Sequence, residues 1–144
     1  NAQNSIYLEW KIWFERLNPL LYEVVILIGL SLGGIFLVKY LSENNFPKKV
    51  MATFLVAAPY NTATHHPLAD FVISKNLDKF SKQVDKIFIY HSKDDQVVRF
   101  ANFESYQQVL PLAQVKIFKD RGHFNQESLP EIVEDIKALD DQTI

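Results

Sequence analysis

The stretch from residue 23 to residue 39 most constrains how this chain can fold. Its apolar, β-rich run over residues 24–28 stops at Gly29, Ser31 follows, and a helical apolar pattern begins at once. This is Gly-x-Ser-x-Gly between a strand and a helix, the arrangement that makes a serine a nucleophile. A turn this sharp strains the serine backbone, and Gly29 and Gly33 are expected to remove side-chain collisions there. We therefore expect the Ser31 hydroxyl to project from the sheet beside the free N–H groups of the following helix.

Other interpretations of this segment fit less well. A phosphate-binding loop needs Lys followed by Ser or Thr after its last glycine, where this chain has Ile35 and Phe36. A dinucleotide-binding loop needs glycine at the position of Ser31. The uncharged run of residues 24–38 is shorter than the roughly 20 residues of a membrane-spanning helix, and glycines interrupt it. A tight turn with a buried serine hydroxyl is the alternative to a nucleophile.

Strand-like and helix-like patterns alternate along the chain. We expect strands over residues 24–28, 50–57, 86–90 and 114–118, and helices over residues 6–17, 32–42, 100–110 and 129–139. Residues 60–84 are less regular, and we expect them to cross the top edge of the sheet with short helical patches at 68–73 and 77–81. Trp10 and Trp13 are predicted to anchor the first helix in the core. The alternation predicts an α/β fold: a doubly wound, mostly parallel sheet with helices on both faces.

Composition limits the functions open to the chain. Of its 144 residues, 48% are hydrophobic, which suits a single α/β domain over residues 1–144. The net charge is −2 and no basic stripe is visible, so nucleic acid is not an expected partner. The absence of cysteine excludes disulfides, thiolate-bound metals and a cysteine nucleophile. Without a signal peptide or lipidation motif in this sequence, a cytoplasmic protein that does not bind membranes is the expectation.

The start of the chain predicts an incomplete domain. Residues 1–4 lack an initiating methionine and read like the inside of a loop. A parallel sheet usually has strands on both sides of its nucleophile strand, whereas nearly all of this chain follows that strand. We therefore expect the N-terminal strand or strands of the domain to be missing from this sequence.

Two further polar loops follow predicted strands. Asp94 and Asp95 come after the third strand, and Gly122 and His123 come after the fourth. Ligands in open α/β sheets bind outside the carboxyl ends of the strands, so both loops are expected at the same rim as Ser31. A serine nucleophile needs a base, and the base needs an orienting partner. The order Ser, Asp, His along the chain is that of the α/β-hydrolase triad.

Each of these polar residues also has a simpler interpretation. His123 fits a turn histidine, although Gly122 before it permits close backbone approach and its position after a strand favours a functional role. Asp95 fits a solvated loop carboxylate, and Asp94 competes with it for the acidic position. His65 and His66 could suggest a metal pair, but adjacent residues rarely share one metal and no acidic or cysteine ligand lies near them. We expect no metal site there.

Three motifs make the chain resemble the small serine α/β-hydrolases of the YdeN and retinoblastoma-binding-protein-nine type, over nearly the whole sequence. They are Gly-Leu-Ser-Leu-Gly-Gly at residues 29–34, His-Ser-Lys-Asp-Asp-Gln-Val-Val at 91–98 and Gly-His-Phe-Asn at 122–125. The resemblance implies an α/β-hydrolase fold, and it assigns the catalytic aspartate to Asp95 rather than Asp94. The loop that supplies a second oxyanion donor in that family has no counterpart in this sequence, and losing one donor costs on the order of 10²–10³ in rate.

Taken together, these residues predict a serine hydrolase that acts on a small-molecule ester or amide-like acyl substrate. Ser31 is the expected nucleophile, His123 the base and then the acid, and Asp95 the residue that orients the imidazole. The Leu32 N–H is the expected oxyanion donor, aided by the helix N-terminus. No cofactor is implied. Activity is expected to rise with pH through an imidazole titration near about 6–7.

The substrate pocket and two alternative functions are less defined by the sequence. Phe71 and Phe124 are candidate walls of a modest apolar pocket, although core packing is the commoner use of phenylalanine. A catalytically silent protein-interaction module could use the same fold. An acyltransferase could use the same three polar residues with an acceptor other than water.

Overall fold

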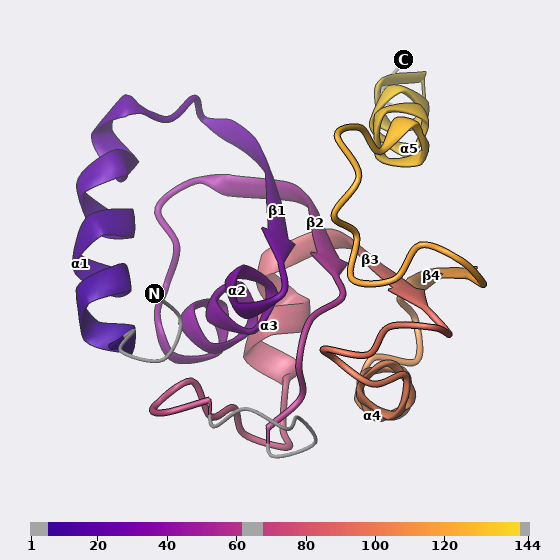
Figure 1. Ribbon diagram of the computed structural model, residues 1–144. Helices are drawn as coiled ribbons and strands as arrows, with labels where there is room; N and C mark the ends of the chain where they lie inside the picture. Colours follow the sequence, from indigo (N-terminus) through magenta and orange to yellow (C-terminus); the bar gives the residue numbers. More distant parts are fainter. Residues whose placement is uncertain (1–5, 62–67, 142–144) are drawn as a thin grey trace.

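The computed structural model describes residues 6–61 and 68–141 (Figure 1). Its centre is a four-stranded parallel sheet in the order β1-β2-β3-β4. The strands are β1 (Val24–Leu30), β2 (Lys49–Val56), β3 (Val84–Ser92) and β4 (Gln114–Phe118). Each parallel pair needs a crossover, and here each crossover contains a helix. The predicted α/β fold is confirmed, and all four predicted strands are present.

Helices cover both faces of this sheet, as predicted. They are α1 (Tyr7–Leu17), the short 3₁₀ turn η2 (Asn18–Leu20), α2 (Leu32–Glu43), α3 (Asp78–Gln83), α4 (Ala101–Val109) and α5 (Pro130–Asp141). The larger part of the core lies against α1, α2, α3 and α4, whereas α5 lies apart on the opposite face (Figure 1). No helix within the described ranges is long and apolar enough to cross a membrane.

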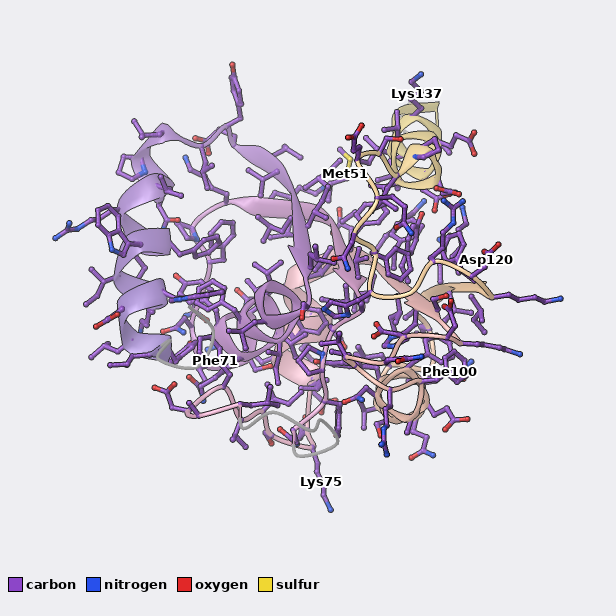
Figure 2. The ribbon with its side chains drawn as sticks, viewed as in Figure 1. Met51, Phe71, Lys75, Phe100, Asp120 and Lys137 are labelled. Carbon is purple, nitrogen blue, oxygen red and sulfur yellow. The ribbon has the colours of Figure 1, made fainter. Side chains whose placement is uncertain are left out.

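The smaller core, under α5, is built from large side chains on neighbouring strands. The rings of Phe54 and Phe88 stack with their centroids 4.4 Å apart, and Ile132 and Leu139 of α5 complete the cluster. Met51 packs against the same cluster on the α5 side (Figure 2). Burial of these side chains removes apolar surface from water and fixes α5 to the sheet.

The two tryptophans of α1 lie in different environments. Trp10 packs between Phe36 and Phe71, with ring centroids 5.7 and 5.2 Å away, so its predicted core position is confirmed. The same prediction for Trp13 is wrong, because this side chain is 66% exposed and Arg16 lies over its ring. Only one side of α1 packs against α2, and Trp13 projects from a different side of the helix.

The irregular segment between β2 and β3 differs in part from expectation. The predicted patch 77–81 is present as α3, but the predicted helical patch 68–73 is wrong. There the Phe71 N–H donates to Leu68 at 2.9 Å, a turn, and the Ile73 N–H donates to the Asn61 side chain at 2.8 Å. The Asn61 side chain takes the Ile73 N–H that a helix would need for its own hydrogen bond.

One edge of the sheet is β1, and the other is β4. Within the described ranges β1 pairs with β2 alone, in parallel register from Val24 opposite Lys49 to Leu30 opposite Val56. Val24, Ile28 and Leu30 point to the face of the sheet that carries α5, but α5 does not cover them. Their side chains are 44%, 51% and 46% exposed. The strand that leads into Ser31 is thus at an edge of the four-stranded sheet.

Candidate active site

Ser31 occupies the strained turn that joins β1 to α2. Its backbone has φ 52° and ψ −120°, a conformation that L-residues rarely adopt. The Ser31 N–H donates to the Val56 carbonyl at 2.8 Å, which holds this turn to the end of β2. Leu32 is the first residue of α2, and N–H groups in a first helical turn have no acceptor within the helix. The hydroxyl and the free helix N-terminus therefore share one rim of the sheet.

The predicted role of Gly29 beside Ser31 is confirmed, whereas that of Gly33 is not. A Cβ at Gly29 would lie 2.6 Å from the backbone of both Gly33 and Gly34, and a Cβ at Gly34 would lie 2.6 Å from Ala58. A Cβ at Gly33 would meet nothing within 4 Å, so the prediction that Gly33 prevents a collision is wrong. α2 passes close to the end of β1, and the residues that must lack a Cβ there are Gly29 and Gly34.

The different surroundings of Gly29 and Gly33 predict that an added methyl group lowers stability at Gly29 and raises it at Gly33. Replacing Gly29 with alanine forces the backbone of α2 away from β1, and we expect a loss of about 3 kcal/mol. Gly33→Ala is the matched control, because it adds the same methyl group in open space and improves helix propensity by up to about 1 kcal/mol. Urea unfolding of both variants measures the effect. Equal stability of the two would contradict the packing described here.

The structure brings Ser31, His123 and Asp95 into one chain of hydrogen bonds. His123 Nε2 lies 3.0 Å from Ser31 Oγ, and His123 Nδ1 lies 2.8 Å from Asp95 Oδ2. An ionised carboxylate can only accept, so Nδ1 carries the proton in this pair and Nε2 is free to accept from the serine hydroxyl. The Asp95 side chain is fully buried, and the imidazole keeps 15% exposure towards solvent.

Asp95 is held by its own loop. Its Oδ1 accepts from the N–H groups of Val97 at 2.8 Å and Val98 at 2.9 Å, which leaves Oδ2 to face His123. A buried carboxylate is tolerated only when hydrogen bonds replace its lost hydration. The two backbone donors therefore stabilise the charge and also set which oxygen faces the imidazole.

Asp94, the competing carboxylate, has a different environment. Its Oδ1 accepts from Ser92 Oγ at 2.5 Å and from the Gly122 N–H at 2.9 Å, and these bonds lower the pKa of this carboxyl. Ser92 Oγ in turn accepts from the Arg121 N–H at 2.9 Å. Asp94 therefore joins the acidic loop to the histidine loop, whereas Asp95 contacts the imidazole.

The loop before His123 requires a left-handed backbone conformation at one residue. Gly122 has φ +54°, which glycine adopts at no steric cost. A Cβ there would meet nothing within 4 Å, so the predicted close backbone approach at Gly122 is wrong and the requirement is conformational. The loop is also tied to α5, because the Arg121 guanidinium donates to the Glu131 carboxylate.

The two candidate pocket residues are both packed in the core. Phe71 has 0% exposure and lies against the rings of Tyr7 and Trp10, on the α1 side of the molecule (Figure 2). Phe124 is 3% exposed, and its ring meets Phe118 edge to face at 5.5 Å. Neither ring presents a surface to a substrate in this structure.

Sequence reasoning missed another histidine beside this site, and this one is buried. His91, near the end of β3, is 1% exposed, and its Nε2 lies 2.8 Å from the Val98 carbonyl and 3.8 Å from Asp95 Oδ2. Because a carbonyl can only accept, Nε2 carries a proton and donates it to Val98. The sequence did contain a sign that His91 is buried, because this residue continues the apolar run of a strand that is buried on both faces.

Burial lowers the pKa of His91, against the opposing effects of the Val98 hydrogen bond and the Asp95 charge. The unfolded chain then binds a proton at higher pH than the folded protein does, so stability falls as pH drops below about 6.5. We expect His91→Gln, which keeps a donor but cannot titrate, to lose less stability than the unmodified protein between about pH 7 and about pH 5. Urea midpoints at both pH values measure this. Identical losses in the two proteins would contradict it.

Metal ligands do not gather in the described part of the chain: no group of three or more His, Cys, Asp or Glu side chains there could hold an ion. His65 and His66 lie outside the described residues.

Comparison with known proteins identifies the family. The sequence profile of the family described as serine hydrolase matches residues 3–139. The chain belongs to the serine hydrolase family. No curated protein matches this serine hydrolase in sequence.

Solved structures share the fold of this serine hydrolase. The ydeN gene product from B. subtilis superposes with a TM-score of 0.82 at 20% identity, covering 98% of this chain and 80% of that one. A meta-cleavage product hydrolase (CumD) from Pseudomonas fluorescens IP01 gives 0.73 at 12% identity, covering 98% and 74%. The esterase domain of a Rhodothermus marinus protein gives 0.59 at 21% identity, covering 85% and 61%. These similarities show an α/β-hydrolase fold with esterase-like neighbours.

Proposed function

We propose that this serine hydrolase cleaves small acyl esters or amide-like acyl substrates through an acyl-enzyme on Ser31. The observation that carries the proposal is the unbroken hydrogen-bond chain from Ser31 Oγ through His123 to Asp95, with distances of 3.0 and 2.8 Å. A base within hydrogen-bond reach activates a serine hydroxyl, and a carboxylate behind the base keeps it in the productive tautomer.

In the first half-reaction, Ser31 Oγ attacks the acyl carbonyl carbon while His123 Nε2 takes the hydroxyl proton. The oxyanion of the tetrahedral intermediate accepts a hydrogen bond from the Leu32 N–H, where the positive end of the α2 dipole also lies. The bond to the leaving alcohol or amine then breaks, and His123 Nε2 gives it the proton. Asp95 stabilises the imidazolium throughout.

In the second half-reaction, water replaces the leaving group. His123 Nε2 takes a proton from water as the hydroxide attacks the acyl carbon, and the bond to Ser31 Oγ breaks. The proton returns to Ser31 Oγ and a carboxylic acid leaves. Transfer of the acyl group to an alcohol or amine would use the same steps with that acceptor in place of water.

The substrate class follows from the site and not from one relative. The structural neighbours include an esterase domain and a meta-cleavage product hydrolase, two different descriptions that do not indicate one substrate. Since Phe71 and Phe124 are packed in the core, they support no particular acyl chain. A small activated ester is therefore the appropriate first substrate.

The proposal is tested with a fluorophosphonate probe and with 4-nitrophenyl acetate. We expect covalent labelling of the purified protein and release of nitrophenol, with labelling blocked by excess substrate. Acetic acid as the sole acyl product indicates hydrolysis, whereas an acetylated added alcohol indicates acyl transfer. A folded protein that neither labels nor turns over would overturn the proposal in favour of a catalytically silent interaction module.

A further inference from the structure

We propose that His91 is a positioning residue that locks the turn carrying Asp95, so that the Asp95 carboxylate presents one oxygen to His123. The proposal rests on the function proposed above and adds a residue that acts through another one. It depends on three hydrogen bonds in the turn of residues 95–98, in which the side chains of Asp95 and Val98 are buried.

The first step is that His91 is itself held rigidly. It lies in β3, where its backbone pairs with Ile117 of β4, and its side chain is 1% exposed. The rings of Phe100 and Phe103 confine the imidazole from the α4 side, with centroids 5.9 and 6.3 Å away. Phe100 lies at the start of α4 (Figure 2). A donor fixed on a strand defines position better than one on a loop.

The second step links His91 to the loop. Its Nε2–H donates to the Val98 carbonyl at 2.8 Å, and that same residue's N–H donates to Asp95 Oδ1 at 2.9 Å. The Val97 N–H gives the second bond to Oδ1, at 2.8 Å. The imidazole thus holds the carbonyl side of Val98, while the N–H side of the same residue holds the carboxylate. Without this donor, the buried Val98 carbonyl has lost its partner and the turn is free to rearrange.

The third step concerns charge. The titratable groups that face His91 are Asp95, whose Oδ2 lies 3.8 Å from Nε2, and His123 beyond it. From α4, only the uncharged rings of Phe100 and Phe103 pack on the imidazole. Burial lowers the pKa of His91, so it is a neutral donor at neutral pH and does not compete with His123 as a cationic partner for Asp95.

The test compares variants that keep or lose the donor. His91→Gln retains an N–H near the position of Nε2, whereas His91→Leu and His91→Met fill the space without one. Proton NMR follows the downfield resonance of the His123 Nδ1–H bond to Asp95, which Asp95→Asn must abolish. We expect His91→Leu and His91→Met to weaken or remove this resonance and His91→Gln to keep it.

Kinetics give a second readout. We expect kcat to fall on the order of 10²-fold in His91→Leu, because small misplacements of a catalytic group have effects of this size. KM should change less than about threefold, since ground-state binding is untouched, and His91→Gln should restore kcat. Tyr106→Phe is the matched control: it removes another buried donor to a carbonyl, Pro59 at 2.8 Å, without touching the Asp95 turn. Tyr106→Phe should retain both the resonance and kcat.

The outcomes separate this proposal from the proposed function. Should a folded His91→Leu or His91→Met protein keep the resonance and kcat within about threefold, the positioning role is wrong while the hydrolase proposal stands. Should the unmodified protein lack hydrolysis and labelling, the hydrolase proposal fails, and the NMR comparison still decides whether His91 sets the Asp95–His123 contact.

Discussion

Ser31→Ala is expected to lower the rate of ester hydrolysis on the order of 10⁴-fold or more and to abolish fluorophosphonate labelling. The variant keeps the Ser31 backbone turn but removes Oγ, which lies 3.0 Å from His123 Nε2 and would form the proposed acyl-enzyme. Residual turnover would come from the helix N-terminus and from substrate binding alone. The measurements are 4-nitrophenyl acetate kinetics and gel fluorescence of the probe-treated protein.

A second serine provides the control for this variant. Ser105 is exposed on α4, where its hydroxyl donates to the Ala101 carbonyl at 3.0 Å. We expect Ser105→Ala to label and turn over like the unmodified protein. Labelling that survives in Ser31→Ala but disappears in another serine variant would overturn the assignment of the nucleophile.

Asp95→Asn is expected to reduce kcat on the order of 10⁴-fold, with little effect on folding. The carboxamide oxygen can keep the bonds from Val97 and Val98, and this turns the amide NH₂ towards His123 Nδ1. His123 then has to accept at Nδ1 and carry its proton on Nε2, so it can no longer accept the proton of Ser31. The expected loss therefore follows from a reversed tautomer rather than from lost packing.

Asp94→Asn is the matched control, one residue away and with the same change of atoms. Its Oδ1 accepts from Ser92 and from the Gly122 N–H, and an amide oxygen can accept both bonds, although more weakly than a carboxylate. We expect kcat to stay within about threefold of the unmodified protein. Steady-state kinetics of both variants decide the matter, and a larger loss in Asp94→Asn than in Asp95→Asn would reject the assignment of the acidic residue.

Much of the architecture was predictable because its signals are local. The continuous apolar runs of β1 and β2 predict parallel strands, and the strand, Ser31 and helix pattern predicts a sharp turn at a single residue. Burial was predictable for β2 but not for β1, which is half exposed at an edge. The limits of β3 were less predictable. It extends to Val84 and Ser92, beyond its apolar run, because these residues pair with Val50 of β2 and Phe118 of β4.

The errors have a common physical origin in contacts between distant residues. The exposure of Trp13 depends on which side of α1 meets α2, and periodicity alone does not define the width of that contact. The predicted need for a glycine at Gly33 is instead found at Gly34, because Ala58, after β2, lies beside α2 there. His91 was missed because nothing in its neighbouring residues shows that its ring lies beside Asp95.

Local pattern alone was enough for the strands, the helices, the serine turn and the kinds of polar residue at the strand ends, because these features depend on neighbours within a few positions. The meeting of Ser31 with His123, 92 positions apart, and of His123 with Asp95, 28 positions apart, belongs to the tertiary structure. Parallel pairing of the four strands brings their carboxyl ends to one rim. The hydrogen bonds of the loops then direct the Asp95 carboxylate, and not that of Asp94, towards His123. Distances of this kind follow from register and packing, which no short stretch of sequence contains.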